Sequence, residues 1–372
     1  MNYLSLIRYK NYRNLEDQEI YLSKNINIFV GPNGSGKTNI LESISLLSPG
    51  KGFKRQSLDK LQKFNCNSTW VIFNKYINNN FESNISITYE KKDEGSISKK
   101  ILFNRKQEKK TDKLNTKPLI LWFIPEMERL FSGQPSLRRN FIDRIAYSFD
   151  SSILSNLRLY KKLINERNEI FKRSNNPDWL DKVEEKIVEL GIKIIDKRLK
   201  AIQIINKTFD LIKSNEIDII RSEIKLIYNK KDLKEDIMNY DQYKYLLKSS
   251  RKEDFYRGGC KIGPHKSDIE VFYSKNKLEA SYCSTAQQKE IILNILLSQS
   301  YALINKMNFP PVLLLDEVCS HLDENTRKLL LQLADWLQIQ VLMTGTDKNF
   351  FSVLFEKANF FDVNNGIIKK IK

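Results

Sequence analysis

The sequence is poor in the residue types that build metal sites and disulfide frameworks. It has four cysteines and two histidines among 372 residues, and no two cysteines form a C-x-x-C pair. Neither a structural zinc site nor a disulfide framework is therefore expected. The cysteines are Cys66, Cys260, Cys283 and Cys319.

Long hydrophobic runs are also missing. No stretch approaches the length of uninterrupted apolar sequence that a membrane helix needs, and the apolar run within Met1–Arg8 is too short for a secretion signal. We therefore expect a cytoplasmic protein with no membrane partner. The length allows one domain with a sizeable insertion, or two domains.

Acidic residues are outnumbered by basic ones. The formal charge is +17 and the sequence pI is about 9.4, which favours a polyanionic partner such as nucleic acid. An AT-rich genome would explain abundant lysine, but it explains the excess of bases over acids less well. Solvated basic faces are the plain alternative for any single cluster. Candidate basic residues are Lys99, Lys100, Arg105, Lys106, Lys109, Lys110 and Lys113, and on a predicted helix Lys161, Lys162, Arg167, Lys172 and Arg173.

The segment Gly31–Thr38 fits the phosphate-binding loop pattern G-x-x-x-x-G-K-[ST]. Its context agrees, because Ile26–Val30 predicts a strand and Thr38–Leu47 a helix. Backbone N–H groups of such a loop point at phosphates, and the helix start adds partial positive charge. We expect Lys37 to reach the β and γ phosphates of ATP and the Thr38 hydroxyl to hold Mg²⁺. The candidate ATP-binding residues of this segment are Asn33, Gly34, Ser35, Gly36, Lys37, Thr38 and Asn39.

Two carboxylates follow the apolar run Val312–Leu315. The run predicts a buried parallel strand, so these carboxylates lie at the carboxyl edge of a sheet, where ligands bind. Asp316 is the candidate Mg²⁺ residue, and Glu317 is the candidate general base for the attacking water. A structural strand end is the alternative when the run is taken alone.

A third motif, Ser284–Lys289, precedes the helical run Glu290–Tyr301 and places Ser284 at the N-cap position. An ordinary capped helix is the plain alternative. The order of this segment, the aspartate strand and then Ser320–Asp323 matches ATP-binding-cassette (ABC) heads, where the signature of one subunit closes over the ATP of another. Two chains would then build one site. The further candidate nucleotide contacts are Ser284 in trans, Gln287, His321 and Asp323.

Between these motifs the pattern changes from strands to helices. β-rich runs at 70–76, 84–89 and 96–103 predict an antiparallel meander, and 119–124 another strand. Apolar residues at helical spacing within 153–171 and 180–194, joined by a turn at 174–178, predict a helical hairpin. The sequence thus predicts an α/β ABC-type ATPase head, with a mixed sheet and a meander, and an inserted helical arm domain. The expected domains are 1–135, 136–260 and 261–372.

The chain resembles the RecF family of bacterial recombination mediators along nearly its whole length. The matching segments are Asn11–Arg13, Asn33–Glu42, Pro125–Glu126, Arg138–Arg144, Asn165–Asn168, Gly263–Asp268, Ser284–Lys289, Leu314–Glu317 and Met343–Asp347. The resemblance implies an ATP-dependent homodimer with weak DNA-stimulated ATPase activity. It also implies binding to double-stranded and gapped DNA, association with the nucleoid, cooperation with RecR and RecO, and help in loading RecA.

Two departures from related ATPases bear on mechanism. Ala286 stands where the signature usually has glycine, and its methyl group could slow hydrolysis by narrowing the fit to phosphate. No switch histidine follows the strand Gln338–Thr344, so γ-phosphate sensing would fall to Thr344 or Thr346. Glu126 and Gln134 are alternatives for the Q-loop residue.

Three other classes compete with this interpretation. A transporter nucleotide-binding subunit would usually show Leu-Ser-Gly-Gly-Gln and a switch histidine. A small-molecule kinase leaves residues 284–289 and 320–323 unexplained. An ATP-dependent scaffold that ignores DNA is harder to exclude, and the salt dependence of DNA binding separates it.

Overall fold

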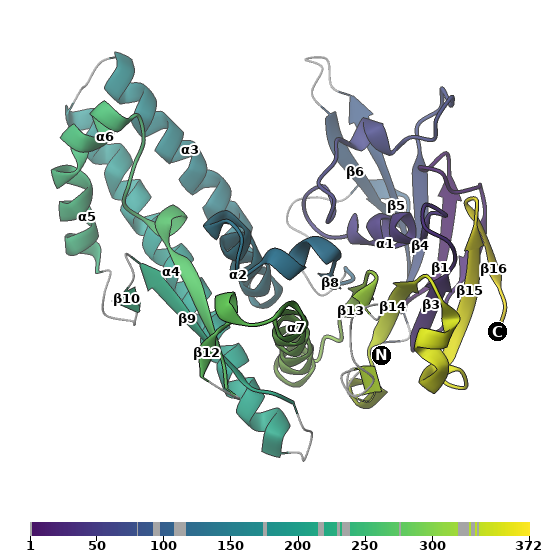
Figure 1. Ribbon diagram of the computed structural model, residues 1–372. Coiled ribbons are helices and arrows are strands. Elements are labelled where there is room, and N and C mark those ends of the chain that lie inside the picture. Colours follow the sequence, from purple (N-terminus) through teal and green to yellow (C-terminus); the bar gives the residue numbers. More distant parts are fainter. Residues whose placement is uncertain are drawn as a thin grey trace. The chain divides into compact units, whose positions relative to one another are not determined.

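Three β-sheets organise the part of the chain that the structure describes, two in a first compact unit and one in a second (Figure 1). In this computed structural model the first unit comprises residues 1–128 and 292–372, and the second comprises residues 129–291. The expected domain boundaries at residues 135 and 260 remain a prediction. The described residues are 2–79, 81–91, 97–107, 117–173, 177–214, 219–228, 231–232, 239–274, 277–318, 327–328, 332 and 335–372.

One sheet of the first unit carries the parallel strands that the apolar runs predict. Its order is β16-β15-β3-β14-β13-β8, and β16 runs antiparallel to β15 while the other neighbours pair in parallel. Every residue of β3, β8, β13 and β14 is buried, which explains their continuous apolar sequences. The strands are β3 (Ile26–Val30), β8 (Ile120–Phe123), β13 (Val312–Leu315), β14 (Gln340–Gly345), β15 (Ala358–Asn364) and β16 (Ile367–Lys370).

The other sheet of the first unit confirms the predicted meander. Its order is β2-β1-β4-β5-β6-β7, with antiparallel neighbours throughout. The strands are β1 (Tyr3–Lys10), β2 (Glu19–Tyr21), β4 (Val71–Asn78), β5 (Phe81–Lys91), β6 (Ile97–Phe103) and β7 (Lys106–Gln107).

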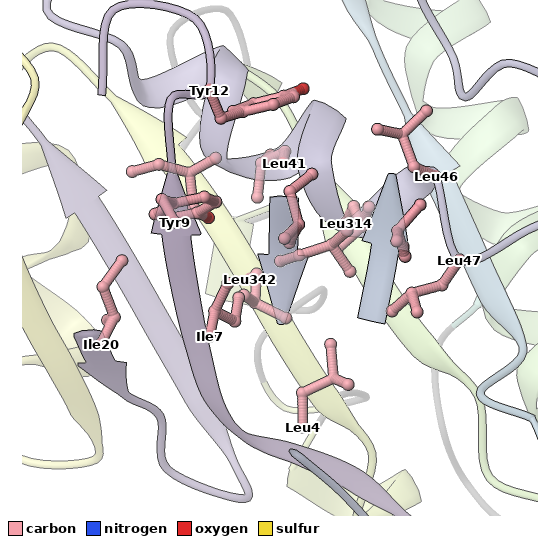
Figure 2. Packing of buried hydrophobic residues seen from close by; sticks show 14 of the residues in the cluster. Leu4, Ile7, Tyr9, Tyr12, Ile20, Leu41, Leu46, Leu47, Leu314 and Leu342 are labelled. Carbon is pink, nitrogen blue, oxygen red and sulfur yellow. The ribbon is translucent and has the colours of Figure 1, made fainter. Parts of the chain in front are cut away.

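Helix α1 (Lys37–Ser45) joins these two sheets in one hydrophobic core (Figure 2). Leu4 and Ile7 from β1, Leu41 from α1, Leu314 from β13 and Leu342 from β14 belong to the same buried cluster. Burial of each such side chain stabilises the fold by about 1.5–3 kcal/mol. The core therefore fixes the start of α1 against the ends of β13 and β14.

The second unit contains the predicted helical hairpin. Helices α3 and α4 share a buried cluster that includes Tyr160, Leu163, Val183 and Ile187. Residues 174–176 of the expected turn lie outside the described residues, and Pro177, which suits the first helical position, already belongs to α4. The helices are α2 (Pro135–Phe149), α3 (Ser152–Arg173), α4 (Pro177–Ser214), α5 (Tyr240–Ser249) and α6 (Arg251–Arg257).

A small antiparallel sheet completes the second unit. Its order is β10-β9-β11-β12, with antiparallel neighbours throughout. Its strands are β9 (Ser222–Tyr228), β10 (Lys231–Asp232), β11 (Asp268–Tyr273) and β12 (Leu278–Glu279). Helix α7 (Thr285–Met307) follows. Among the described helices, none is both long enough and apolar enough to cross a membrane.

Candidate nucleotide-binding site

The phosphate-binding loop lies between β3 and α1, as the sequence predicts, and α1 begins one residue early at Lys37. The N-cap residue Gly36 has φ +112°. A Cβ atom there would lie 2.8 Å from Leu15 Cδ2 and 3.0 Å from Asn14 Oδ1. Only glycine combines that backbone conformation with so little room, so the loop shape is set locally by Gly36.

The side chain of Lys37 is buried inside this loop. Its Nζ donates to the carbonyl oxygens of Gly31 at 2.7 Å and Pro32 at 2.9 Å. Burial lowers the pKa of Lys37, while the charges of Glu317 and Asp316 act in the opposite direction. The structure thus brings Lys37 into electrostatic range of both carboxylates that the sequence selected.

Asp316 meets the phosphate-binding loop directly. Its Oδ1 accepts hydrogen bonds from the Thr38 hydroxyl at 3.1 Å and the Thr344 hydroxyl at 2.7 Å. Burial raises the pKa of Asp316, and these two hydrogen bonds oppose that rise. A hydroxyl and a carboxylate are hard oxygen ligands, and Mg²⁺ sites commonly use few such protein ligands beside phosphates and water. The pair Thr38 and Asp316 therefore fits Mg²⁺.

Glu317 occupies a strained position immediately after β13. Its φ is +50°, which is uncommon for a non-glycine residue. Its backbone N–H donates to the Thr344 hydroxyl at 2.9 Å. Thr344, one of two expected γ-phosphate sensors, is buried and holds both Asp316 and the turn at Glu317, whereas Thr346 is exposed.

The motif residues Asn11–Arg13 and Glu42 lie beneath the loop. Arg13 forms a bidentate pair with Glu42, with Nε at 3.0 Å and Nη2 at 2.8 Å from the two carboxylate oxygens. Asn14 Nδ2 donates to the carbonyl of Gly34 at 3.3 Å. These contacts hold α1 at Glu42, and the loop at Gly34, against residues 13 and 14.

Lys54 is a site residue that sequence reasoning missed. Its Nζ donates to Asn39 Oδ1 at 3.2 Å, and its charge acts to lower the pKa of Asp316. The backbone N–H of Phe53 donates to Ser45 Oγ at 3.1 Å, which fixes this segment against α1. Lys54 belongs to no motif, so only the fold reveals that it adds positive charge near the carboxylates. Asn39 also donates to Asn14 Oδ1 at 2.8 Å.

Ser284 is the N-cap residue of α7, as predicted. The backbone N–H of Ser284 donates to Gln287 Oε1 at 3.0 Å, and the backbone N–H of Gln287 donates to Ser284 Oγ at 3.3 Å. This reciprocal pair is a capping box. Ser284, Thr285 and Ala286 are exposed. They belong to the second unit, and a contact of Ser284 or Gln287 with ATP remains a prediction.

For several other predicted site residues, contact with ATP remains a prediction. His321 and Asp323 lie outside the described residues. Asn33 and Gly34 are exposed in the loop, and Ser35 is buried. Glu126 and Gln134 are both exposed, so the choice between them for the Q-loop role stays open.

The family motifs of the second unit form a structural network. Arg138 pairs with Asp268 through Nε at 2.8 Å and Nη2 at 2.7 Å. Arg198 pairs with Asp143 at 2.7 and 3.0 Å. His265 accepts from the Tyr160 hydroxyl through Nδ1 and donates to a backbone carbonyl through Nε2, and burial lowers its pKa. These hydrogen bonds and ion pairs therefore hold α2, α3, α4 and β11 together.

Two members of the candidate basic clusters, one buried and one half-buried, make structural contacts. Arg167 is fully buried and pairs with Glu184 and Asp254, each at 2.8 Å. Lys99 donates to the carbonyls of Leu46 and Ser48 at the end of α1. Arg167 was a candidate for contact with DNA, and its complete burial makes that prediction wrong. Lys99 stays a candidate, although its ammonium group is already bound to two backbone carbonyls.

The other basic candidates divide by exposure. Lys161, Lys162, Lys172 and Arg173 are exposed on α3. Lys109, Lys110 and Lys113 lie outside the described residues. Among the described residues, the exposed members of these clusters remain candidates for contact with DNA.

Comparison with known proteins finds relatives that match nearly the whole chain. A family model described as an AAA domain matches residues 6–253. DNA replication and repair protein RecF of Agrobacterium fabrum is 32% identical and that of Rhizobium etli 30%, each covering 98% of this chain and 97% of the relative. A solved structure of the recombination mediator protein RecF with ATP in the RecFOR pathway has TM-score 0.84 and 28% identity, with 100% of this chain and 98% of that chain covered.

A more distant structure shares the fold alone. The SMC head bound to the winged-helix domain of ScpA has TM-score 0.55 and 15% identity, over 99% of this chain and 97% of that one. The fold class is thus the mixed α/β ATPase head shared by RecF and SMC proteins. The extent and identity of the curated matches show that this chain belongs to the RecF family of DNA replication and repair proteins.

Proposed function

We propose that this chain is an ATP-dependent, DNA-binding recombination mediator. It dimerises on ATP, binds duplex DNA beside single-strand gaps and assists RecA loading, together with RecR and RecO. The observation that carries the ATP part is the hydrogen bond between Thr38 and Asp316, residues 278 positions apart in the sequence. Family membership supports the part that concerns repair.

The side chains around the loop suit ATP hydrolysis. Lys37 donates to two backbone carbonyls, and phosphate oxygens are stronger acceptors because they carry charge. Lys37 therefore moves its hydrogen bonds to the β and γ phosphates when ATP binds. Thr38 and Asp316 would hold Mg²⁺, which when bound neutralises charge on the phosphates. Glu317 orients and deprotonates the attacking water.

A second copy of the chain supplies the missing half of the site. Ser284 presents the exposed start of α7, where free N–H groups and the helix dipole favour an anion. Ser284 and Gln287 of one copy contact the γ-phosphate bound by the other. The Ala286 methyl group narrows this contact, which makes hydrolysis slow. ATP then acts as a regulator of a clamp, since loss of the γ-phosphate loosens the dimer.

The net charge of +17 supports DNA as the polyanion that the clamp holds. Each DNA phosphate that the protein neutralises contributes about −0.9 to the slope of log K for DNA binding against the logarithm of the salt concentration. A steep slope with gapped duplex, measured with ATP present, is expected. A dimer that forms with ATP but shows a flat slope would instead indicate a scaffold that ignores DNA.

Light scattering of Glu317→Gln with ATP and gapped duplex tests the clamp. The substitution keeps the size of the side chain but removes the base, so a closed dimer should persist on DNA. Lys37→Ala is the matched control and should form neither the nucleotide complex nor the dimer. A Glu317→Gln chain that stays monomeric with ATP contradicts the proposal.

A further inference from the structure

The tip of the hairpin between β15 and β16 is buried against the phosphate-binding loop. Asn364 pairs with Ile367, which leaves Asn365 and Gly366 as a two-residue turn with φ +48° and +80°. Such Asn-Gly turns usually face solvent because they only reverse the chain. Here Asn365 is exposed, but Gly366 is buried.

Gly366 connects three segments through its backbone. Its N–H donates to the carbonyl of Ser35 in the loop at 3.0 Å. Its carbonyl accepts from the backbone N–H of Glu16 at 3.0 Å and from Gln18 Nε2 at 2.7 Å. Gln18 Oε1 in turn accepts from the backbone N–H of Ile368 at 2.9 Å. The hairpin, the loop and the segment 14–18 are thus tied at one residue.

The packing leaves no room for a side chain at this point. A Cβ atom on Gly366 would lie 1.9 Å from the carbonyl oxygen of Asn14. A Cβ atom on Gly31, where the loop begins, would lie 2.1 Å from the carbonyl oxygen of Val363 in β15. The hairpin therefore contacts the loop at two places, near its beginning and at Ser35.

We propose that Gly366 is a positioning residue for ATP binding, and that the β15–β16 hairpin holds the phosphate-binding loop in its receptive shape. A loop with three glycines loses much backbone entropy when it becomes ordered. A loop ordered before ATP arrives spares the nucleotide that cost, so affinity rises. The inference rests on the proposed ATP binding at this loop, but it concerns the shape of the loop without nucleotide.

Gly366→Ala in the full chain tests the brace, with Gly258→Ala as the matched control. Gly258 also has a left-handed backbone, φ +69°, but a Cβ there meets nothing within 4 Å. Both variants carry similar backbone strain, and only Gly366→Ala pushes against Asn14, whose side chain contacts the loop at Gly34. We expect a weakening of the Kd for a fluorescent ATP analogue by about tenfold or more for Gly366→Ala, and by less than about twofold for Gly258→Ala.

Hydrogen exchange of residues 31–38 without nucleotide gives a second readout. Exchange should be faster in Gly366→Ala than in the wild type and unchanged in Gly258→Ala. If Gly366→Ala fails to fold, Gln18→Ala replaces it, since that variant removes two hydrogen bonds without a steric clash. Equal exchange and equal affinity in the folded variant and the wild type would overturn the inference. A wild-type chain that fails to bind ATP defeats the proposed function, while the exchange measurement still decides whether the hairpin holds the loop.

Discussion

The Thr344 hydroxyl donates to Asp316 Oδ1 at 2.7 Å and accepts from the backbone N–H of Glu317 at 2.9 Å. One side chain on β14 thereby fixes both acidic residues that follow β13. A hydroxyl is needed because it donates and accepts at once. Thr344 is a positioning residue in this arrangement, because it is hydrogen-bonded to the two residues proposed to act on Mg²⁺ and water.

Thr344→Val should slow ATP hydrolysis while the fold is retained. The substitution keeps the branched shape but removes both hydrogen bonds, and loss of such supporting contacts usually lowers activity about 10- to 100-fold. We expect kcat to fall by that factor and the affinity for ATP to change less. Thr344→Ser retains the hydroxyl and should recover most of the activity. A Thr344→Val chain with wild-type kcat would contradict the assigned role.

Arg167→Met should destabilise the second unit. The substitution takes the guanidinium group away from buried Asp254 and leaves Glu184 with Arg251 alone, and breaking a buried pair costs about 3–5 kcal/mol. Urea unfolding followed by circular dichroism measures the change. Arg173→Met on the same helix is the control, because Arg173 is 81% exposed and its pair with Glu169 is worth little. Equal stability of both variants would show that the buried network is unimportant.

The stability of the first unit should carry a pH dependence due to Lys99. Burial, and to a lesser extent the charge of Lys117, lowers the pKa of Lys99 to about 7. The unfolded chain has a Lys pKa of about 10.4, so between these values it binds more protons than the folded chain. Stability therefore rises with pH across this window, and the cost of the buried charge is fully present below pH 7.

Lys99→Met removes this contribution. Relative to Lys99→Met, the wild type should gain stability as pH rises from 7 to 9, measured by urea unfolding at each pH. Lys100→Met is the control, since Lys100 is the next residue along β6 and faces Glu90 at 4.0 Å. A constant difference between wild type and Lys99→Met over this range would rule out the effect.

Mixing two inactive variants tests the shared site. Lys37→Ala removes the loop contact and Ser284→Arg blocks the start of α7, so neither chain alone should hydrolyse ATP. A mixed dimer holds one intact site, built from Lys37 of one chain and Ser284 of the other, so part of the wild-type turnover should return when the two variants are combined. Mixtures that stay inactive while mixed dimers form would exclude a site built from two chains.

The sequence predicted those features that depend on local patterns. The loop Gly31–Thr38, the buried strand before Asp316 and the N-cap at Ser284 each follow from a short run of residues. Residues 217–257 show only a weak pattern among many charged residues, although they contain β9, α5 and α6. Their buried residues pack against distant elements, so a short window of sequence does not reveal these three elements.

The charged residues were harder to interpret than the apolar ones. Arg167 and Lys99 looked like surface cations because their partners, Glu184, Asp254 and the end of α1, lie far away in the sequence. Lys54 had no motif to distinguish it from neighbouring lysines. The role of a charged residue depends on its neighbours in three dimensions, which the sequence does not show. The burial of an apolar run can be predicted from the spacing of its own residues.

The left-handed backbone of Glu317 sets thermal stability against the proposed hydrolysis of ATP. Glycine at this position would relieve roughly 1 kcal/mol of conformational strain while removing the carboxylate. The Glu317→Gly variant should therefore melt at a higher temperature than the wild type, although it lacks the proposed general base. Screens that rank variants of this chain by heat resistance would favour glycine here over the carboxylate that we propose as the general base.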